Sequence, residues 1–392
     1  MNDQRRALWR LALIIPGGIA LLGGLNGALM LLDVSAPVDE TRLRDGHGII
    51  LVIGFIGTLI AVERAVALRR AWGYLSPICL GVGALLFMSP AATLLGRSLF
   101  VIGSLMLVAV YVPLWKRSKD PTVLVQILGA VSLSSAAILW LRDVPPSVFV
   151  PWLVAFVVLT IAAERIELAR VGIFDVGLRE QADARLLTVA LAIFAAATAS
   201  VLWPEYGTPA LGLALLVLVA WLSQADVARK LVKATGAQRF MAICLLSGYV
   251  WLAIAAVTWI ALGPVSTGPV STGPGYDAVV HSVFLGFAIT MIMAHAPVIL
   301  PAVLRRPLPY RPYMYGPLIL LHIGLVFRIL IGDAFDTTAV HVVGGVINVA
   351  ALLAFVVGAV WSVVTASRAQ TAAKAATVAT EQTSPELTET ES

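Results

Sequence analysis

The chain has 392 residues, of which 59% are hydrophobic and 12% are charged, and its mean hydropathy is +0.93. Soluble domains carry about 25% charged residues, so this composition excludes a soluble fold. The net charge of +5 comes from basic residues that separate apolar runs instead of forming one patch, and nucleic acid is therefore not an expected partner.

The apolar runs predict an all-α, polytopic membrane protein. A helix that spans a bilayer needs about 20 mostly apolar residues, and twelve runs in the sequence meet this requirement. In chain order they cover residues 11–32, 47–68, 74–95, 98–115, 122–141, 146–168, 186–203, 208–225, 238–262, 278–300, 314–332 and 338–366. An even number of spans places both termini on the same side of the bilayer.

The distribution of basic residues predicts the orientation. Of the 27 Lys and Arg residues, 22 fall on the side of the termini, four fall on the other side, and Arg328 lies within the eleventh span. Loops on the cytoplasmic side are enriched in Lys and Arg, so both termini are expected in the cytoplasm and the protein in the cytoplasmic (inner) membrane. Residues 1–366 form the predicted membrane domain. Residues 367–392, which are rich in Ala, Thr and Glu, are expected to form a disordered cytoplasmic tail.

A weak internal repeat links three of the predicted spans. The second ends in GTLIAVERAVALRR, the sixth in LTIAAERIELARV and the tenth in ITMIMAHAPVILPAV, so Glu63, Glu164 and His295 occupy equivalent points. Because these spans are four apart, the pattern suggests three pseudo-repeated units of four helices. Chance similarity between apolar helices that end in a charge is the alternative.

The five histidines lie on or at the edge of predicted helices and divide into two layers. His281 and His295 are 14 residues apart on the tenth span, which separates them by roughly 21 Å on nearly the same helix face. His47 and His341 open the second and twelfth spans at the outer side, level with His281. His322 lies roughly 12 Å deep from the inner side, near the level of His295. Polar residues inside a membrane usually serve a function, so we expect an outer trio and an inner pair of metal or haem ligands. Hydrogen bonds between helices are the alternative use.

Haem b is the cofactor that this arrangement favours, with one or two copies. The spacing of His281 and His295 is the one that stacked bis-histidine haems use in cytochrome b bundles. Copper is an alternative at the inner pair, because Met291 lies one turn from His295 and Met314 opens the eleventh span, and thioethers suit Cu(I). Ordinary packing is the commoner role of methionine.

Arg328 is a candidate partner of a haem propionate, since it lies towards the outer end of the eleventh span; an ion pair with Asp333 is the alternative. Two further pairs, Glu63–Arg64 and Glu164–Arg165, stand at inner helix ends. In each pair, the arginine is expected to extend to the membrane surface and to form an ion pair with the neighbouring glutamate. A path for proton input is the alternative function of these pairs.

Two segments resemble a known family. The segment LRDGHGIILVIGF around His47 and the segment from His281 to Leu304, HSVFLGFAITMIMAHAPVILPAVL, resemble the second and tenth helices of the NnrS family. Those are twelve-helix membrane proteins with haem and copper, associated with nitric oxide stress and denitrification. More distantly, the pattern resembles subunit I of haem-copper oxidases and nitric oxide reductases, where histidines of the second and tenth helices hold the low-spin haem. The resemblance implies that His47, His281 and His295 are ligands.

The sequence departs from those families in three places. The sixth and seventh spans contain no histidine, the tenth lacks an H-x-H pair, and Ile49 stands where the second helix of the NnrS family has a second histidine. An oxygen-reducing binuclear centre is therefore not expected.

The function expected from these features is haem binding, with nitric oxide or respiratory electrons as the substrate and haem-dependent oxidoreduction as the candidate activity. The expected partners are the lipid bilayer and a quinone or another electron-transfer partner. A twelve-helix transporter or permease is one alternative. A non-catalytic accessory protein that binds haem is the other.

Overall fold

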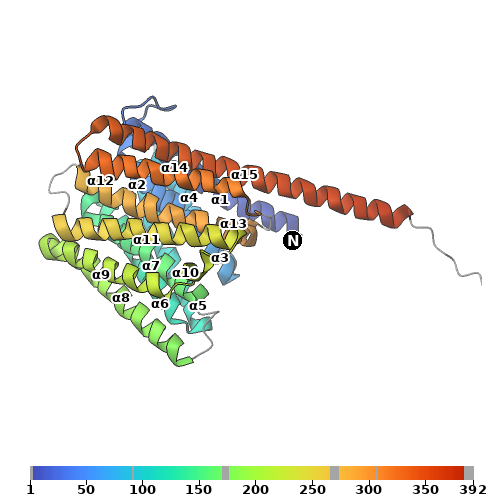
Figure 1. Cartoon of the computed structure of the whole chain (residues 1–392), viewed down its shortest axis with the longest axis horizontal. Coiled ribbons are helices and arrows are strands. Elements are labelled where there is room, and N and C mark those ends of the chain that lie inside the picture. The colour runs from blue at the N-terminus through green and yellow to red at the C-terminus, as the bar shows by residue number, and fades with distance from the viewer. Residues whose placement is uncertain (1–2, 91, 170–175, 265–272, 305–307, 384–392) are drawn as a thin grey trace, which may run out of the picture.

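The computed structural model describes residues 3–90, 92–169, 176–264, 273–304 and 308–383, and in these ranges every regular element is a helix (Figure 1). The elements, in chain order, are α1 (Asp3–Leu31), α2 (Thr41–Ile49), η1 (Ile50–Gly57), α3 (Thr58–Leu68), η2 (Ala71–Tyr74), α4 (Leu75–Met88), α5 (Thr93–Ser118), α6 (Pro121–Leu141), α7 (Pro146–Ala169), α8 (Val176–Leu202), α9 (Pro204–Ala225), α10 (Ala228–Leu231), α11 (Gly236–Leu262), α12 (Pro274–His281), η4 (Ser282–Ile289), α13 (Thr290–Leu304), η5 (Pro312–Met314), α14 (Tyr315–Leu325), η6 (Val326–Asp333) and α15 (Thr338–Thr383). The elements η2 and η5 are 3₁₀ turns, whereas η1, η4 and η6 are π-helical.

In the described residues, twelve helical segments are long and apolar enough to cross a membrane, which confirms the predicted number and the all-α class. Several of them combine elements. The second span is α2–η1–α3, the tenth is α12–η4–α13 up to Val298, and the eleventh is η5–α14–η6. The third joins η2 and α4, and each of the twelve spans corresponds to one predicted apolar run.

Span boundaries differ from the prediction at several points. The third span ends at Met88 and not at residue 95, because Ser89 is extended with ψ 140° and precedes Pro90. The second begins at Thr41, six residues before the predicted start. The last helix, α15, continues to Thr383, past residue 367 where disorder was expected. Its Ala-rich sequence has high helix propensity, which accounts for this difference.

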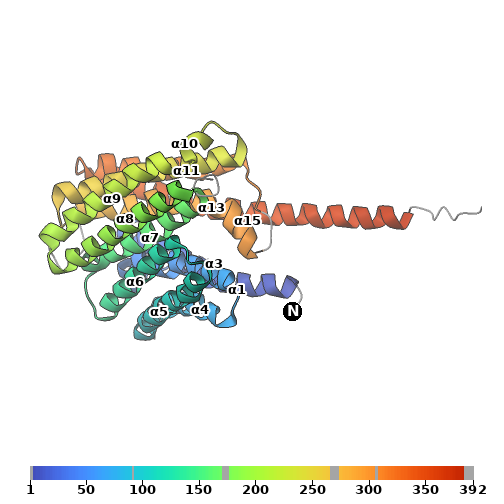
Figure 2. The same cartoon turned by 90° about the horizontal axis from the view of Figure 1, so that it is seen from below.

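Three spans form the interior of the bundle. In the most apolar windows of the second, sixth and tenth spans, 67%, 78% and 72% of the residues are buried, against 33–56% in the other nine. Contacts of α7 with η4, and of α3 with α13, join these three spans. The others surround them, mostly in chain order. Figure 2 shows α4 and α5 at one side of the bundle, α9 and α11 at the opposite side, and α7 between them.

The two ends of the bundle are distinct. The N-terminus and the long projecting part of α15 emerge at the same end, and α2 and α12 lie at the opposite end (Figure 1). Following the predicted orientation, we call the end with α2 and α12 the outer end and the other the inner end. The predicted threefold repeat and the cytoplasmic location of the termini stay predictions.

Candidate functional site

A cavity lies between the second, tenth, eleventh and twelfth spans and α1, towards the outer end of the bundle. We call it the outer cavity. Its volume is about 580 Å³, open mouth included, and its lining is apolar apart from four polar side chains. These are His47 of α2, His281 of α12, Arg328 of η6 and Asn348 of α15. The structure thus gathers two histidines of the predicted outer trio around one apolar space, together with the predicted arginine.

The two imidazoles of the outer cavity are oriented in the same way. The Nδ1 atom of His47 lies 3.3 Å from the carbonyl oxygen of Arg44. The Nδ1 atom of His281 lies 3.0 Å from both the carbonyl oxygen and the carboxylate Oδ1 of Asp277. All these partners are hydrogen-bond acceptors, so Nδ1 carries the proton and donates in both rings. The remaining nitrogen, Nε2, then holds the lone pair that binds a metal.

Arg328 is held beside the same space by an aspartate that the sequence analysis did not single out. Its Nε and Nη2 atoms donate to the two carboxylate oxygens of Asp277, at 2.8 and 2.7 Å. A Cβ atom at Gly345 would lie 2.8 Å from Nη1 of Arg328, so this glycine leaves room for the guanidinium group. The alternative partner, Asp333, instead accepts from Nδ1 of His341 at 2.8 Å.

All three π-helical segments in the described part of the chain border the outer cavity. Leu51 and Val52 belong to η1, Phe284 and Leu285 to η4, and Arg328 to η6. Each segment is eight residues long, whereas well under 1% of residues in proteins are π-helical. Such turns are found frequently at functional sites. Their convergence is an indication of function that does not depend on the histidines.

His295, the inner histidine of the tenth span, lies in a buried polar cluster. Its Nδ1 atom donates to the carbonyl oxygen of Met291 at 2.7 Å, and its Nε2 atom lies 3.1 Å from Nη1 of Arg165. Since arginine only donates, Nε2 is the acceptor in that contact. Both ring nitrogens therefore have protein partners. Met291 takes part through its backbone oxygen.

His322, the second member of the predicted inner pair, has a different set of partners. Its Nδ1 atom accepts from Nε1 of Trp251 at 2.9 Å, and its Nε2 atom lies 3.0 Å from Oγ of Ser247. The ring is also nearly parallel to that of Trp251, with 13° between the planes and 6.3 Å between the centroids. The contacts of His322 are thus with α11, and those of His295 are with α7 and its own helix. Ligation of a second centre by these two histidines stays a prediction.

The charged pairs at the inner end connect the interior spans. Arg64 pairs with the neighbouring Glu63, as expected, and also lies 3.4 Å from Glu164 of the sixth span. Arg165 does not pair with its neighbour Glu164. It binds both carboxylate oxygens of Asp226, at 3.0 and 2.8 Å. The sequence analysis missed Asp226, which is 61 residues away in the loop after α9.

Asp226 is buried and accepts four hydrogen bonds. Besides the two from Arg165, its oxygens accept from the hydroxyl of Tyr249 at 2.6 Å and from the backbone N–H of Ala228 at 2.9 Å. Burial by itself raises the pKa of the Asp226 carboxyl. The hydrogen bonds and charge of Arg165 outweigh that effect and hold the pKa below its usual range. Asp226 is therefore a carboxylate that fixes Arg165 next to His295.

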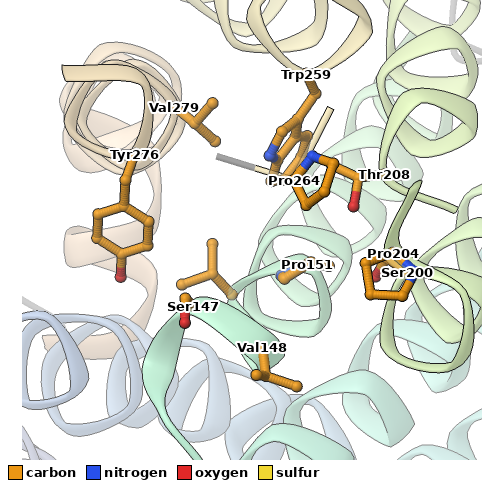
Figure 3. A pocket seen from close by; sticks show the side chains of 11 residues that line it. Ser147, Val148, Pro151, Ser200, Pro204, Thr208, Trp259, Pro264, Tyr276 and Val279 are labelled. Atoms are coloured by element: carbon orange, nitrogen blue, oxygen red, sulfur yellow. The ribbon is translucent and has the colours of Figure 1, made fainter. Parts of the chain in front are cut away.

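A second cavity of about 520 Å³ lies near the outer end of the bundle, and α12 separates it from the first. Tyr276 and Val279 of α12 line this second cavity, whereas Val280 and His281 line the outer cavity. Figure 3 shows Tyr276 and Val279 on one side, with Thr208 and Ser200 across from them. Among the residues that the structure describes, no histidine and no charged side chain lines it, so these residues offer no metal ligand of the expected kind.

Comparison with known proteins gives a family and no activity. The family model described as a domain of unknown function (DUF8744) matches residues 10–364. No curated protein and no solved structure matches the chain.

Proposed function

The chain belongs to the DUF8744 family, a domain of unknown function, and from the geometry of the outer cavity we propose that it is a membrane haem b protein that transfers electrons. The observation that carries the proposal is the pair of imidazoles on one apolar cavity, each with Nδ1 bound to an acceptor. Histidines that ligate a metal usually donate their other ring N–H to a carbonyl or carboxylate oxygen, as His47 and His281 do.

The lining of the outer cavity suits a haem group in its polarity. Cofactor sites are mostly apolar with a few placed polar groups, as this cavity is. His47 and His281 would hold the iron, and Arg328 would offset the negative charge of a propionate. Asp277 contacts both His281 and Arg328, so one carboxylate orients the residue that would hold the iron and the residue that would face a propionate.

Ligation by two histidines favours electron transfer over binding of a gas. Held by His47 and His281, a haem would supply one-electron oxidation and reduction. The resemblance to the NnrS family supports a role in nitric oxide or respiratory electron metabolism, in the inner membrane and with a quinone or another redox carrier as partner.

Absorption spectra of the purified protein test this proposal. The protein is expressed with a supply of haem and purified in detergent, and haem is measured per chain. We expect one haem b per chain, with a Soret band and with sharp α and β bands after reduction, as for two imidazole ligands. A protein without a Soret band contradicts the proposal.

The same preparation separates the alternatives. A permease purifies without haem and moves its substrate in an uptake assay. An accessory haem protein gives the same spectrum as an electron carrier, but a quinol analogue does not reduce it. Rapid reduction by the quinol therefore favours electron transfer.

Filling the outer cavity is expected to exclude haem without unfolding the protein. A Cβ atom at Gly48, on the lining, meets nothing within 4 Å, so Gly48→Leu places its side chain in the space where the haem would lie. We expect the haem content per chain to fall several-fold, measured by extraction and spectroscopy.

Gly18→Leu is the matched control for that variant. A Cβ atom at Gly18 also meets nothing within 4 Å, but this glycine of α1 does not line the cavity. Its haem content should equal that of the unmodified protein. Equal haem content in the two variants would show that the cavity is not where haem binds.

A further inference from the structure

Two carboxylates and an imidazole meet at the outer end, beside the outer cavity. Asp277 of α12, Asp333 of η6 and His341 of α15 each place one ligand atom within 4.8 Å of the others. Their side chains are 18%, 8% and 24% exposed. The three residues come from the tenth, eleventh and twelfth spans, so the cluster joins three separate parts of the chain.

One oxygen of this cluster lacks a partner. Oδ1 of Asp333 accepts from His341, whereas the buried Oδ2 accepts no hydrogen bond from the described residues, and the carboxylate that interacts with Asp333 is that of Asp277. A buried carboxylate oxygen without a donor or a cation is costly. The side chain that carries it is more than nine-tenths buried, and it stands against a second carboxylate of like charge. Oδ2 of Asp333 therefore lacks a cationic partner among the described residues.

The positive charge nearby is already committed. Arg328 uses Nε and Nη2 on the two oxygens of Asp277, which leaves the imidazole of His341 as the donor to Asp333. If Arg328 also serves a haem propionate, it shares its charge between that group and Asp277. A divalent cation supplies what the cluster lacks.

The backbone holds the donors in place. A Cβ atom at Gly332 would lie 2.7 Å from Cα of His341, so only glycine at position 332 allows η6 to approach α15 this closely. This contact is between main-chain atoms and sets Asp333, the next residue, beside His341. The cluster is thus built by the packing of two helices and not by the chance approach of long side chains.

We propose that Asp277, Asp333 and His341 bind a divalent cation, Zn²⁺ or Mn²⁺. Carboxylate oxygens with one imidazole suit these ions, whereas Cu(I) prefers the sulfur ligands that the set lacks. The cation clamps three spans together and fixes Asp277, which in turn orients His281 and Arg328. The cation site does not depend on the haem proposal, although the cation would steady the haem ligands.

Metal titration of the purified full-length protein without a histidine tag tests the site. After treatment with a chelator, Zn²⁺ is titrated calorimetrically and Mn²⁺ binding is followed by electron paramagnetic resonance. We expect one ion per chain, and an affinity at least tenfold lower in Asp333→Asn and in His341→Gln. Helix content and size-exclusion profiles establish that both variants are folded.

Asp336→Asn is the control, because Asp336 is exposed in the loop after η6 and its φ of 51° is one that asparagine adopts readily. Its affinity should be unchanged. Absence of stoichiometric binding, or equal affinity in Asp333→Asn and Asp336→Asn, overturns the proposal. In that case the carboxylates of Asp277 and Asp333 share a proton instead of binding a cation. Haem is measured in the same samples. Haem without metal contradicts only the cation site, and metal without haem contradicts only the proposed function.

Discussion

Replacing His281 with alanine is expected to remove haem from the protein. The variant lacks one of the two imidazoles on the outer cavity and leaves Asp277 without the ring N–H that it accepts. A single axial histidine in an open apolar cavity retains haem poorly, so we expect less than about one tenth of the normal haem content. His47→Ala should behave in the same way. The Soret absorbance per chain of freshly purified protein measures the effect.

His322→Ala is the informative control for these variants. Both ring nitrogens of His322 are used by Trp251 and Ser247 of α11, so its loss should leave one haem per chain and an unchanged spectrum. Retention of haem in His281→Ala together with its loss in His322→Ala would move the site to the inner end. Two haems in the unmodified protein, with one lost in each variant, would establish the second centre that the sequence predicts.

The helical scaffold and the outer histidines could be predicted because each depends on local pattern. Span number follows from the lengths of apolar runs, and the depth of a residue follows from its distance to the helix end. That logic placed His47 and His281 at one level, and the structure has both on one cavity. It could not give the start of the second span, because the polar stretch from Thr41 to Asp45 lacks the apolar pattern on which the estimate depends.

The acidic partners were missed because most of their contacts are distant in sequence. Arg328 and Asp277 are 51 residues apart, and Arg165 and Asp226 are 61 residues apart. Each arginine also has an acidic residue closer in the sequence, Asp333 for Arg328 and Glu164 for Arg165. Closeness in sequence favoured these residues, but the partners in the structure are Asp277 and Asp226. One local pattern was available: Asp277 precedes His281 by four residues, which puts both on one helix face.

The inner histidines show a different limit of sequence reasoning. Depth places His295 and His322 in one layer, but depth says nothing about which neighbour each ring faces. The structure directs His295 to Arg165 and His322 to Trp251, on different helices. The neighbour that a side chain faces depends on how all the spans pack together. The residue pattern along a single span carries no information about that packing.

Replacing Asp226 with asparagine is expected to destabilise the protein by about 3–5 kcal/mol, because it leaves a buried guanidinium group without its counter-charge. Arg165 is 5% exposed and Asp226 is 4% exposed, and the carboxylate accepts four hydrogen bonds, two of them from Arg165. Asparagine has a similar shape but no charge. Its NH₂ group would face hydrogen-bond donors at a position where a carboxylate oxygen of Asp226 accepts. Thermal unfolding in detergent, followed by loss of helical circular dichroism, measures the change.

Asp143→Asn is the matched control, since Asp143 forms an ion pair with Arg97 but its side chain is 79% exposed. Exposed pairs contribute about 0–1 kcal/mol, so this variant should unfold close to the temperature of the unmodified protein. Equal shifts in the two variants would show that the Arg165–Asp226 pair does not stabilise the junction of the interior spans.

The pH dependence of the same pair provides a further measurement. The pKa of Asp226 is lower in the folded than in the unfolded protein, so its stabilising effect is complete above a pH of about 4, the usual carboxyl pKa, and is lost as the pH falls further. Asp226→Asn has no such group to protonate. Its unfolding temperature should therefore fall less steeply on acidification than that of the unmodified protein, and the two curves should converge at low pH. Parallel curves would mean that Asp226 stays paired in the unfolded state or carries no net stabilisation in the folded one.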